Sequence, residues 1–172
     1  MLKIFKTFVK KIVYTLLGLF GTLKSSTNKN LFHDIYIIGD LYSESGLGNI
    51  MRSLIQSFGD DYSCKLINLP LSVGSHQGSY KFSKQVVKKI GPGISIFVGN
   101  PSILAQALMK LNTFYLISNY TIGVWFWELG NAPQDWITAG RLVDEVWAQS
   151  DFAADAFRQP HAVTKIMPFA LQ

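Results

Sequence analysis

The chain has 172 residues, 48% of them hydrophobic and 16% charged, which excludes an intrinsically disordered protein and allows one domain with a sizeable core. A single cysteine excludes a disulfide framework, and no histidine and cysteine cluster has zinc-ligand spacing. The formal net charge is +5, but residues 1–30 contain six lysines and no acidic residue, which leaves 10 basic and 11 acidic residues elsewhere. Basic charge confined to one arm indicates a membrane surface as partner and argues against nucleic acid.

The N-terminal arm, residues 1–30, has the pattern of a basic amphipathic helix followed by a polar linker. Its uncharged stretch, residues 12–23, is shorter than the about 20 residues that span a bilayer. The pattern therefore predicts a helix lying at the membrane surface. Two alternatives stay open: the helix packs on the protein's own body, or it is a signal peptide. The globular domain is expected to occupy residues 31–172.

Strand and helix patterns alternate through this domain. They predict strands at 35–38, 64–69, 94–99, 120–128, 144–150 and 163–167, and helices at 47–58, 82–90 and 101–111 and after residues 131 and 150. Asn131 and Ser150 are the expected N-cap residues of the last two helices, and Asp151 stands in the first turn of the second. The alternation predicts a single α/β, Rossmann-like domain whose mostly parallel sheet has helices on both faces.

The turn after the first strand, Ser45-Gly46-Leu47-Gly48, is a candidate phosphate site. In open α/β sheets ligands bind beyond the carboxyl ends of the strands, and the N–H groups of a helix start attract anions there. Glycines let the backbone approach such a ligand closely. Met51 occupies the third small-residue position of a dinucleotide fingerprint, no acidic residue follows the second strand, and the lysine of a Walker loop is missing. These departures argue against NAD or ATP in those modes, and a plain steric turn stays open.

A tryptophan-rich strand is the second candidate site. All four tryptophans lie between positions 125 and 147. In a strand, Trp125 and Trp127 share one face and Phe126 takes the other. Glu128 follows at the carboxyl end, where a carboxylate beside aromatic rings suits a sugar, whose hydroxyls need polar partners and whose C–H faces stack on rings. The alternative is a tryptophan-rich core with Glu128 solvated.

The other polar residues form no catalytic constellation. The spacing contains no triad, no metal-ligand set and no nucleophile elbow around Ser45, so no catalytic residue and no metal ligand is assigned. We expect His33, His76 and His161 to be surface residues and Cys64 to be a buried apolar residue.

Two segments together resemble a known family. "IGDLYSESGLGNIMRSL", followed by "IGVWFWELGNAPQDWITAGRLVDEVWAQSDFAADAF", is similar to the N-terminal domain of the retaining glycosyltransferases of the GT-B fold, family four, also called group 1. The resemblance lies in the glycine-rich turn at 45–48, the Trp-Glu pair at 127–128, the strand and helix start at 144–152, and the last strand at 163–168. It covers residues 35–170 in order and spacing.

The resemblance implies two Rossmann-like domains that face each other across a cleft. The N-terminal domain holds a glycan or lipid-linked acceptor, and its residues 45–48 reach the phosphates or the sugar of a nucleotide-sugar donor. By this resemblance the acceptor contacts would be Glu44, Trp127, Glu128, Gly130 and Asn131. The C-terminal donor domain, with its Glu-x7-Glu element, is absent from these 172 residues. We therefore expect further sequence or a second chain to supply it, and this chain to be inactive alone.

The same resemblance implies a place in surface polysaccharide synthesis, at the inner, cytoplasmic face of the cell membrane, with no metal and no cofactor beyond the nucleotide-sugar co-substrate. The alternative function is a non-catalytic, membrane-associated α/β binding or scaffold module.

Overall fold

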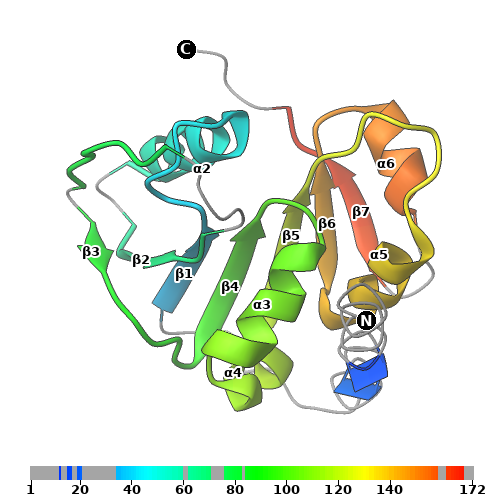
Figure 1. Cartoon of the computed structure of the whole chain (residues 1–172), viewed down its shortest axis with the longest axis horizontal. Helices are drawn as coiled ribbons and strands as arrows, with labels where there is room; N and C mark the ends of the chain where they lie inside the picture. Colours follow the sequence, from blue (N-terminus) through cyan, green and yellow to red (C-terminus); the bar gives the residue numbers. More distant parts are fainter. Residues whose placement is uncertain are drawn as a thin grey trace, which may run out of the picture.

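The protein is described here from a computed structural model, which describes residues 34–59, 62–70, 76–82, 84–158 and 162–168 and five helical positions of the N-terminal arm (12, 15, 16, 19 and 20). Its centre is a seven-stranded sheet in the order β3-β2-β1-β4-β5-β6-β7, and all six strand pairs are parallel (Figure 1). This confirms the predicted α/β, Rossmann-like fold.

The described elements follow one another as expected for such a fold. In chain order they are β1 (Asp34–Gly39), α2 (Gly46–Ser57), β2 (Cys64–Asn68), β3 (Gln85–Val86), β4 (Gly93–Val98), α3 (Ser102–Lys110), α4 (Thr113–Ser118), β5 (Tyr120–Trp125), α5 (Gln134–Ala139), the 3-10 helix η1 (Gly140–Leu142), β6 (Glu145–Ala148), α6 (Asp151–Phe157) and β7 (Val163–Ile166).

Apolar clusters on both faces of the sheet hold the helices in place. In the strand order, β2 lies on one side of β1, whereas β5 lies on the opposite side of β4. Because both crossovers are right-handed, α2 and α3 lie on opposite faces of the sheet. The core on the α2 face includes Ile37, Met51, Ile55, Leu66, Ile96 and Val124. The core on the face of α3 to α6 includes Ile38, Phe97, Leu104, Trp125, Leu142 and Phe157. Strands buried on both faces explain the continuous apolar runs in the sequence.

The prediction of a helix at 82–90 is wrong. This stretch contains the edge strand β3, in which Gln85 and Val86 pair with β2, and Val87 N donates to Leu66 O at 2.8 Å. Neighbouring valines favour a strand over a helix because their branched side chains lose rotamers against a helical turn. The pairing partner, β2, lies far away in the sequence, so local periodicity does not reveal it.

The two predicted helix caps have different outcomes. Ser150 caps α6 by accepting a hydrogen bond from a backbone N–H three residues on, at 3.3 Å, and Asp151 lies in the first turn, as predicted. Asn131 does not cap α5, because Pro133 occupies the N-cap position and no side chain caps the helix. The carbonyl of Asn131 instead accepts a hydrogen bond from the indole of Trp127. This hydrogen bond lies within a loop, because β5 ends at residue 125 and not at the predicted residue 128.

Among the described positions of the N-terminal arm, Phe20 contacts the body. Phe20 is partly buried against the core on the face of α3 to α6. Ile12, Leu16 and Leu19 are exposed, Leu19 to 58%. No helix among the described residues has the length and hydropathy to cross a bilayer. The remaining positions of the arm, and also His33 and His161, lie outside the described residues.

Candidate functional site

A cavity of about 920 Å³ opens at the carboxyl ends of the central strands. It is lined by Asp40, Ser45, Gly46, Leu47, Ile50, Asn100, Ser102, Phe126, Trp127, Glu128, Leu129 and Gln149. These residues follow β1, β4, β5 and β6, so the cavity lies where the strand order reverses between β1 and β4. Ligands of open α/β sheets bind at this switch point, and the volume is that of a small-molecule site.

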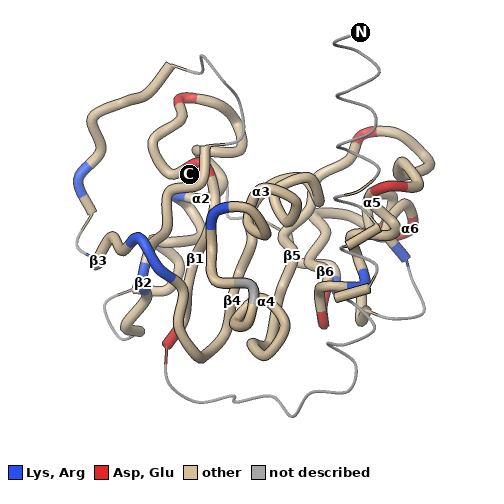
Figure 2. The backbone as a smooth tube through the Cα atoms, turned by 60° about the horizontal axis from the view of Figure 1, so that its bottom comes forward, with Lys and Arg blue, Asp and Glu red and all other residues tan. Residues whose placement is uncertain are grey.

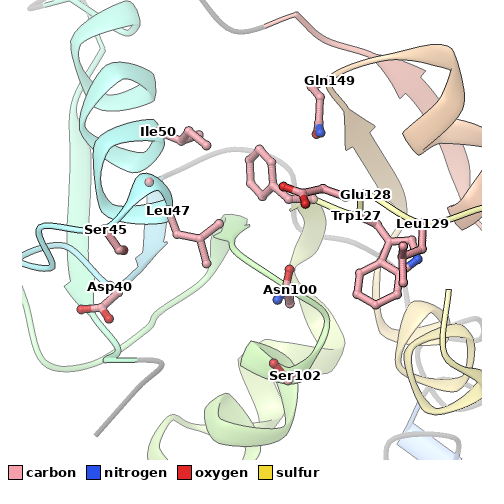
Figure 3. Close-up of a pocket in the computed structure, with 12 residues that line it drawn as sticks. Asp40, Ser45, Leu47, Ile50, Asn100, Ser102, Trp127, Glu128, Leu129 and Gln149 are labelled. Carbon is pink, nitrogen blue, oxygen red and sulfur yellow. The ribbon is translucent and has the colours of Figure 1, made fainter. Parts of the chain in front are cut away.

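The start of α2 forms one wall of the cavity (Figure 3). Ser45 is the N-cap: its hydroxyl accepts from Gly48 N at 3.3 Å, and its own N–H donates to Ser43 Oγ at 3.2 Å. The N–H groups of Gly46 and Leu47 make no hydrogen bond with any described residue. The first turn of α2 therefore presents two available donors at the positive end of the helix dipole.

The two glycines of this turn have different surroundings. Gly46 lines the cavity, and a Cβ added there would have nothing within 4 Å. Gly48 does not line the cavity, and its Cβ would lie 2.1 Å from Ser43 O. That carbonyl also accepts a hydrogen bond from Arg52 Nη1 at 2.8 Å. Glycine is required at position 48 for this close backbone approach, while position 46 has room for a ligand.

The loop after β5 forms the opposite wall. Trp125 is fully buried in one core, Trp127 packs against the same core, and Phe126 packs against the other, which confirms the predicted alternation. The indole of Trp127 is fixed by its hydrogen bond to Asn131 O, at 2.9 Å, and by an edge contact with Trp136 at 4.6 Å between ring centroids. The cavity therefore has an aromatic surface whose orientation is set before any ligand binds.

The predicted acceptor residues divide into two groups. Glu128 and the neighbouring indole at position 127 line the cavity, whereas Glu44, Gly130 and Asn131 do not. Glu44 instead forms an ion pair with His76, with 2.6 Å between Oε2 and Nδ1. Both side chains are exposed, as predicted for His76, so this pair adds little to stability.

Sequence reasoning missed several polar residues of the cavity. Asp40 is only 4% exposed, and Gln149 Oε1 is buried with no hydrogen-bond partner among the described residues. Asn100 and Ser102 lie on the wall between α2 and the loop after β5 (Figure 3). Asp40, Asn100 and Gln149 each stand one or two positions after a buried strand. A polar residue directly after an apolar strand was therefore a signal for a cavity residue, because the carboxyl ends of parallel strands lie at the same edge of the sheet.

The cavity is acidic. Two carboxylates and no lysine, arginine or histidine occur among its described lining residues. Of the 10 basic residues after position 30, six lie between positions 52 and 89, in and around α2, β2 and β3 (Figure 2). The described residues contain no group of three or more histidine, cysteine, aspartate or glutamate side chains that could hold a metal ion. Positive potential at the cavity comes from the backbone of α2.

A carboxylate that accepts several hydrogen bonds lies away from the cavity, at the amino end of β6. Glu145 is 9% exposed and accepts hydrogen bonds from Tyr120 Oη (2.7 Å), Trp147 Nε1 (2.9 Å) and Lys165 Nζ (2.8 Å). Burial opposes ionisation, but these hydrogen bonds outweigh it and hold the pKa of Glu145 below its usual range. Burial and the hydrogen bond to Glu145 raise the pKa of Tyr120. This cluster joins β5, β6 and β7 and is structural.

The fold and the cavity define the class of protein: a Rossmann-like α/β domain with a ligand-sized, acidic and aromatic cavity at its switch point. No protein-family model matches the sequence, and comparisons with curated proteins and with solved structures found no match.

Proposed function

We propose that this domain is the acceptor-binding half of a glycosyltransferase, which moves a sugar from a nucleotide-sugar donor to a glycan or lipid-linked acceptor in surface polysaccharide synthesis. The proposal rests on the cavity, in which an aromatic wall and several polar side chains lie opposite the start of α2. Sugars are bound by this combination, because their C–H faces stack on rings while their hydroxyls need directed hydrogen bonds.

The acceptor occupies the side of the cavity formed by the loop after β5. The fixed ring of Trp127 offers a stacking surface, and Glu128 accepts hydrogen bonds from hydroxyls at the rim. Asn100 and Gln149 can donate and accept through their amides. Four groups from three different strand ends surround one ligand, which is how a sugar ring is oriented for reaction.

The donor's phosphates occupy the side formed by α2. The available N–H groups of Gly46 and Leu47 stabilise the negative charge that develops on the leaving nucleoside diphosphate. A diphosphate carries more charge than two N–H groups balance, and no cationic side chain occurs among the described residues of the lining. The proposal therefore includes a donor half, from further sequence or a second chain, that supplies the remaining contacts.

Peripheral membrane association at the cytoplasmic face is part of the proposal. The arm has six lysines and no acid within residues 1–30, which suits anionic lipid headgroups. Ile12, Leu16 and Leu19 are exposed apolar side chains of its helix, and Phe20 contacts the body. A lipid-linked acceptor would then be held at the same surface as the domain.

A glycan titration with matched tryptophan variants tests the acceptor site. A glycan array identifies the best-binding oligosaccharide, and calorimetry then compares the wild type with Trp127→Ala and Trp147→Ala. Trp127 lines the cavity and Trp147 does not, so we expect the first variant to lose about tenfold or more in affinity and the second to bind as the wild type does. Absence of any glycan binding, or equal losses in both variants, would refute the acceptor role.

Transfer is tested with matched variants of Gly46 in the chain together with its donor half. Gly46 lines the cavity and has open space where a Cβ would be added. Gly46→Asp places a negative charge where phosphate binds, so we expect transfer to be lost, while Gly46→Asn, of the same size and without the charge, retains it. Retained transfer in Gly46→Asp would contradict the phosphate role of α2.

A further inference from the structure

A second cavity, of about 400 Å³, opens between α2 and the segment that leads into β3. Its described lining contains three cationic side chains, those of Arg52, Lys81 and Lys84, and no carboxylate. No described residue lines both cavities. We propose that this second cavity is an anion site, which binds the phosphate group of a lipid headgroup or of a small soluble phosphate. The site is separate from the cavity of the proposed function.

The guanidinium of Arg52 is held in place by neutral partners. Nη1 donates to the carbonyls of Leu41 (3.1 Å) and Ser43 (2.8 Å), and Nη2 donates to Oδ1 of Asn49. The central carbon of the guanidinium lies 4.0 Å from the centroid of the Tyr80 ring. None of these partners carries a charge, so Arg52 keeps its full positive charge. Three of its five N–H donors are used, which leaves two for an anion.

The two lysines keep available donors as well. Lys84 Nζ donates to the carbonyls of Gly59 and Tyr62, the second at 2.8 Å, so one of its three N–H groups remains. Gly59 follows the C-terminal end of α2, whose dipole offsets about half an elementary charge there. Lys81 is exposed and makes no hydrogen bond or ion pair with any described residue. The three cations and this helix end together give the cavity a net charge of about +2.5.

The charge of the surrounding segment has the same sign. Residues 52–89 contain six basic and two acidic residues, whereas the rest of the chain after position 30 contains four basic and nine acidic residues. The two acidic residues, Asp60 and Asp61, lie outside the described residues, and with both of them counted the segment still carries a net charge of +4. Figure 2 shows its basic residues around β2 and β3, at one edge of the sheet. Such a basic edge on an otherwise acidic domain attracts anions to the second cavity.

Phosphate matches this cavity better than a carboxylate does. It carries more charge and more acceptor oxygens, so it can bind N–H groups of arginine and lysine at the same time. A volume of about 400 Å³ is near the lower end for small-molecule sites, which suits a phosphate with a small organic group. Ile55 and Phe82 also line the cavity and offer that group an apolar contact.

An NMR titration with inorganic phosphate at low ionic strength tests the site. Lys81→Gln removes one charge from the cavity, and Lys88→Gln removes one from an exposed side chain outside its described lining. Two unit charges about 4 Å apart change affinity about fivefold even at the dielectric constant of water, about 80. We expect phosphate to shift the amide signals of Gly59 and Lys81 in the wild type. Lys81→Gln should bind about fivefold or more weakly, and Lys88→Gln should stay within about twofold of the wild type.

Sedimentation with vesicles identifies the source of the phosphate group. The vesicles contain phosphatidylcholine, with or without phosphatidylglycerol. Weaker sedimentation of Lys81→Gln than of Lys88→Gln with the anionic vesicles assigns the site to a lipid headgroup. Equal sedimentation of the two variants, together with phosphate binding in solution, assigns it to a soluble phosphate.

Two results would overturn the second anion site. One is the absence of phosphate-induced shifts around Gly59 and Lys81, and the other is an equal loss of phosphate affinity in Lys81→Gln and Lys88→Gln. Shifts confined to Gly46 and Leu47 would overturn it too, but they would leave the phosphate role of α2 in the proposed function intact.

Discussion

Two alanine substitutions in the first turn of α2 should have different effects on stability. Gly48→Ala places a Cβ 2.1 Å from Ser43 O and 3.0 Å from Ser43 C, both of them backbone atoms. Gly46→Ala, two residues earlier in the same helix, places a Cβ in open space. The two variants make the same chemical change, so they differ only in what the new methyl group meets.

The size of the effect follows from what must move. A normal contact requires Ser43 to shift by about 1 Å, and overpacking of this kind costs about 1–3 kcal/mol. The shift also disturbs the guanidinium of Arg52, whose Nη1 donates to Ser43 O and to Leu41 O at 3.1 Å. Hydrogen bonds to charged groups contribute about 1.5–3 kcal/mol, while alanine regains up to about 1 kcal/mol over glycine in a helix. We expect Gly48→Ala to lower the free energy of unfolding by about 2–4 kcal/mol and Gly46→Ala to leave it unchanged or raise it slightly.

Urea unfolding followed by tryptophan fluorescence measures both variants against the wild type. The slope of the transition should be the same in all three proteins, since the surface exposed on unfolding does not change. Equal stability of Gly48→Ala and Gly46→Ala, within about 0.5 kcal/mol, would refute the close approach of α2 to Ser43 and with it the steric role of Gly48.

Three further predictions concern regions outside the cavity. The pKa of Glu145 is lowered by its hydrogen bonds, so the contribution of this carboxylate to stability is present above about pH 4.5 and is lost as the pH falls through its folded-state pKa. Glu145→Gln should therefore be less stable than the wild type by about 1–3 kcal/mol near pH 6. Urea unfolding should show this difference in stability shrinking toward about pH 3. Leu19→Glu should weaken sedimentation with anionic vesicles about tenfold, whereas Leu19→Phe, which keeps the exposed side chain apolar, should bind as the wild type does; equal losses would contradict an inserted apolar face. The buried side chain of Asn119 forms hydrogen bonds with Gly91, Gly93 and Ser95, just before and within the start of β4. Asn119→Ala should therefore lower the free energy of unfolding by about 3 kcal/mol, and a loss below about 1 kcal/mol would show that the network is dispensable.

Most of the fold could be predicted from the sequence because its signals are local. Apolar runs of strand length, helical spacing after position 47 and the cap at Ser150 each depend on neighbours within a few residues, and the structure confirms them. The helix predicted at 82–90 failed because that stretch becomes a strand only by pairing with β2. The cap predicted at Asn131 failed because Pro133 takes the N-cap position and the carbonyl of Asn131 accepts from an indole instead.

The cavity could be predicted only in part. The sequence by itself determined that the turn at 45–48 and Glu128 stand at the carboxyl ends of strands, because each follows an apolar run. The structure, in contrast, ends β5 at residue 125 and so places Trp127 and Glu128 in the loop that follows. Only the tertiary structure decided that Gly46 lines the cavity while Gly48 allows the close approach of the Ser43 carbonyl. It also decided that Asp40 and Gln149, more than a hundred positions apart in the sequence, line the same cavity. The reason is that strand order, which long-range packing sets, decides which strand ends become neighbours.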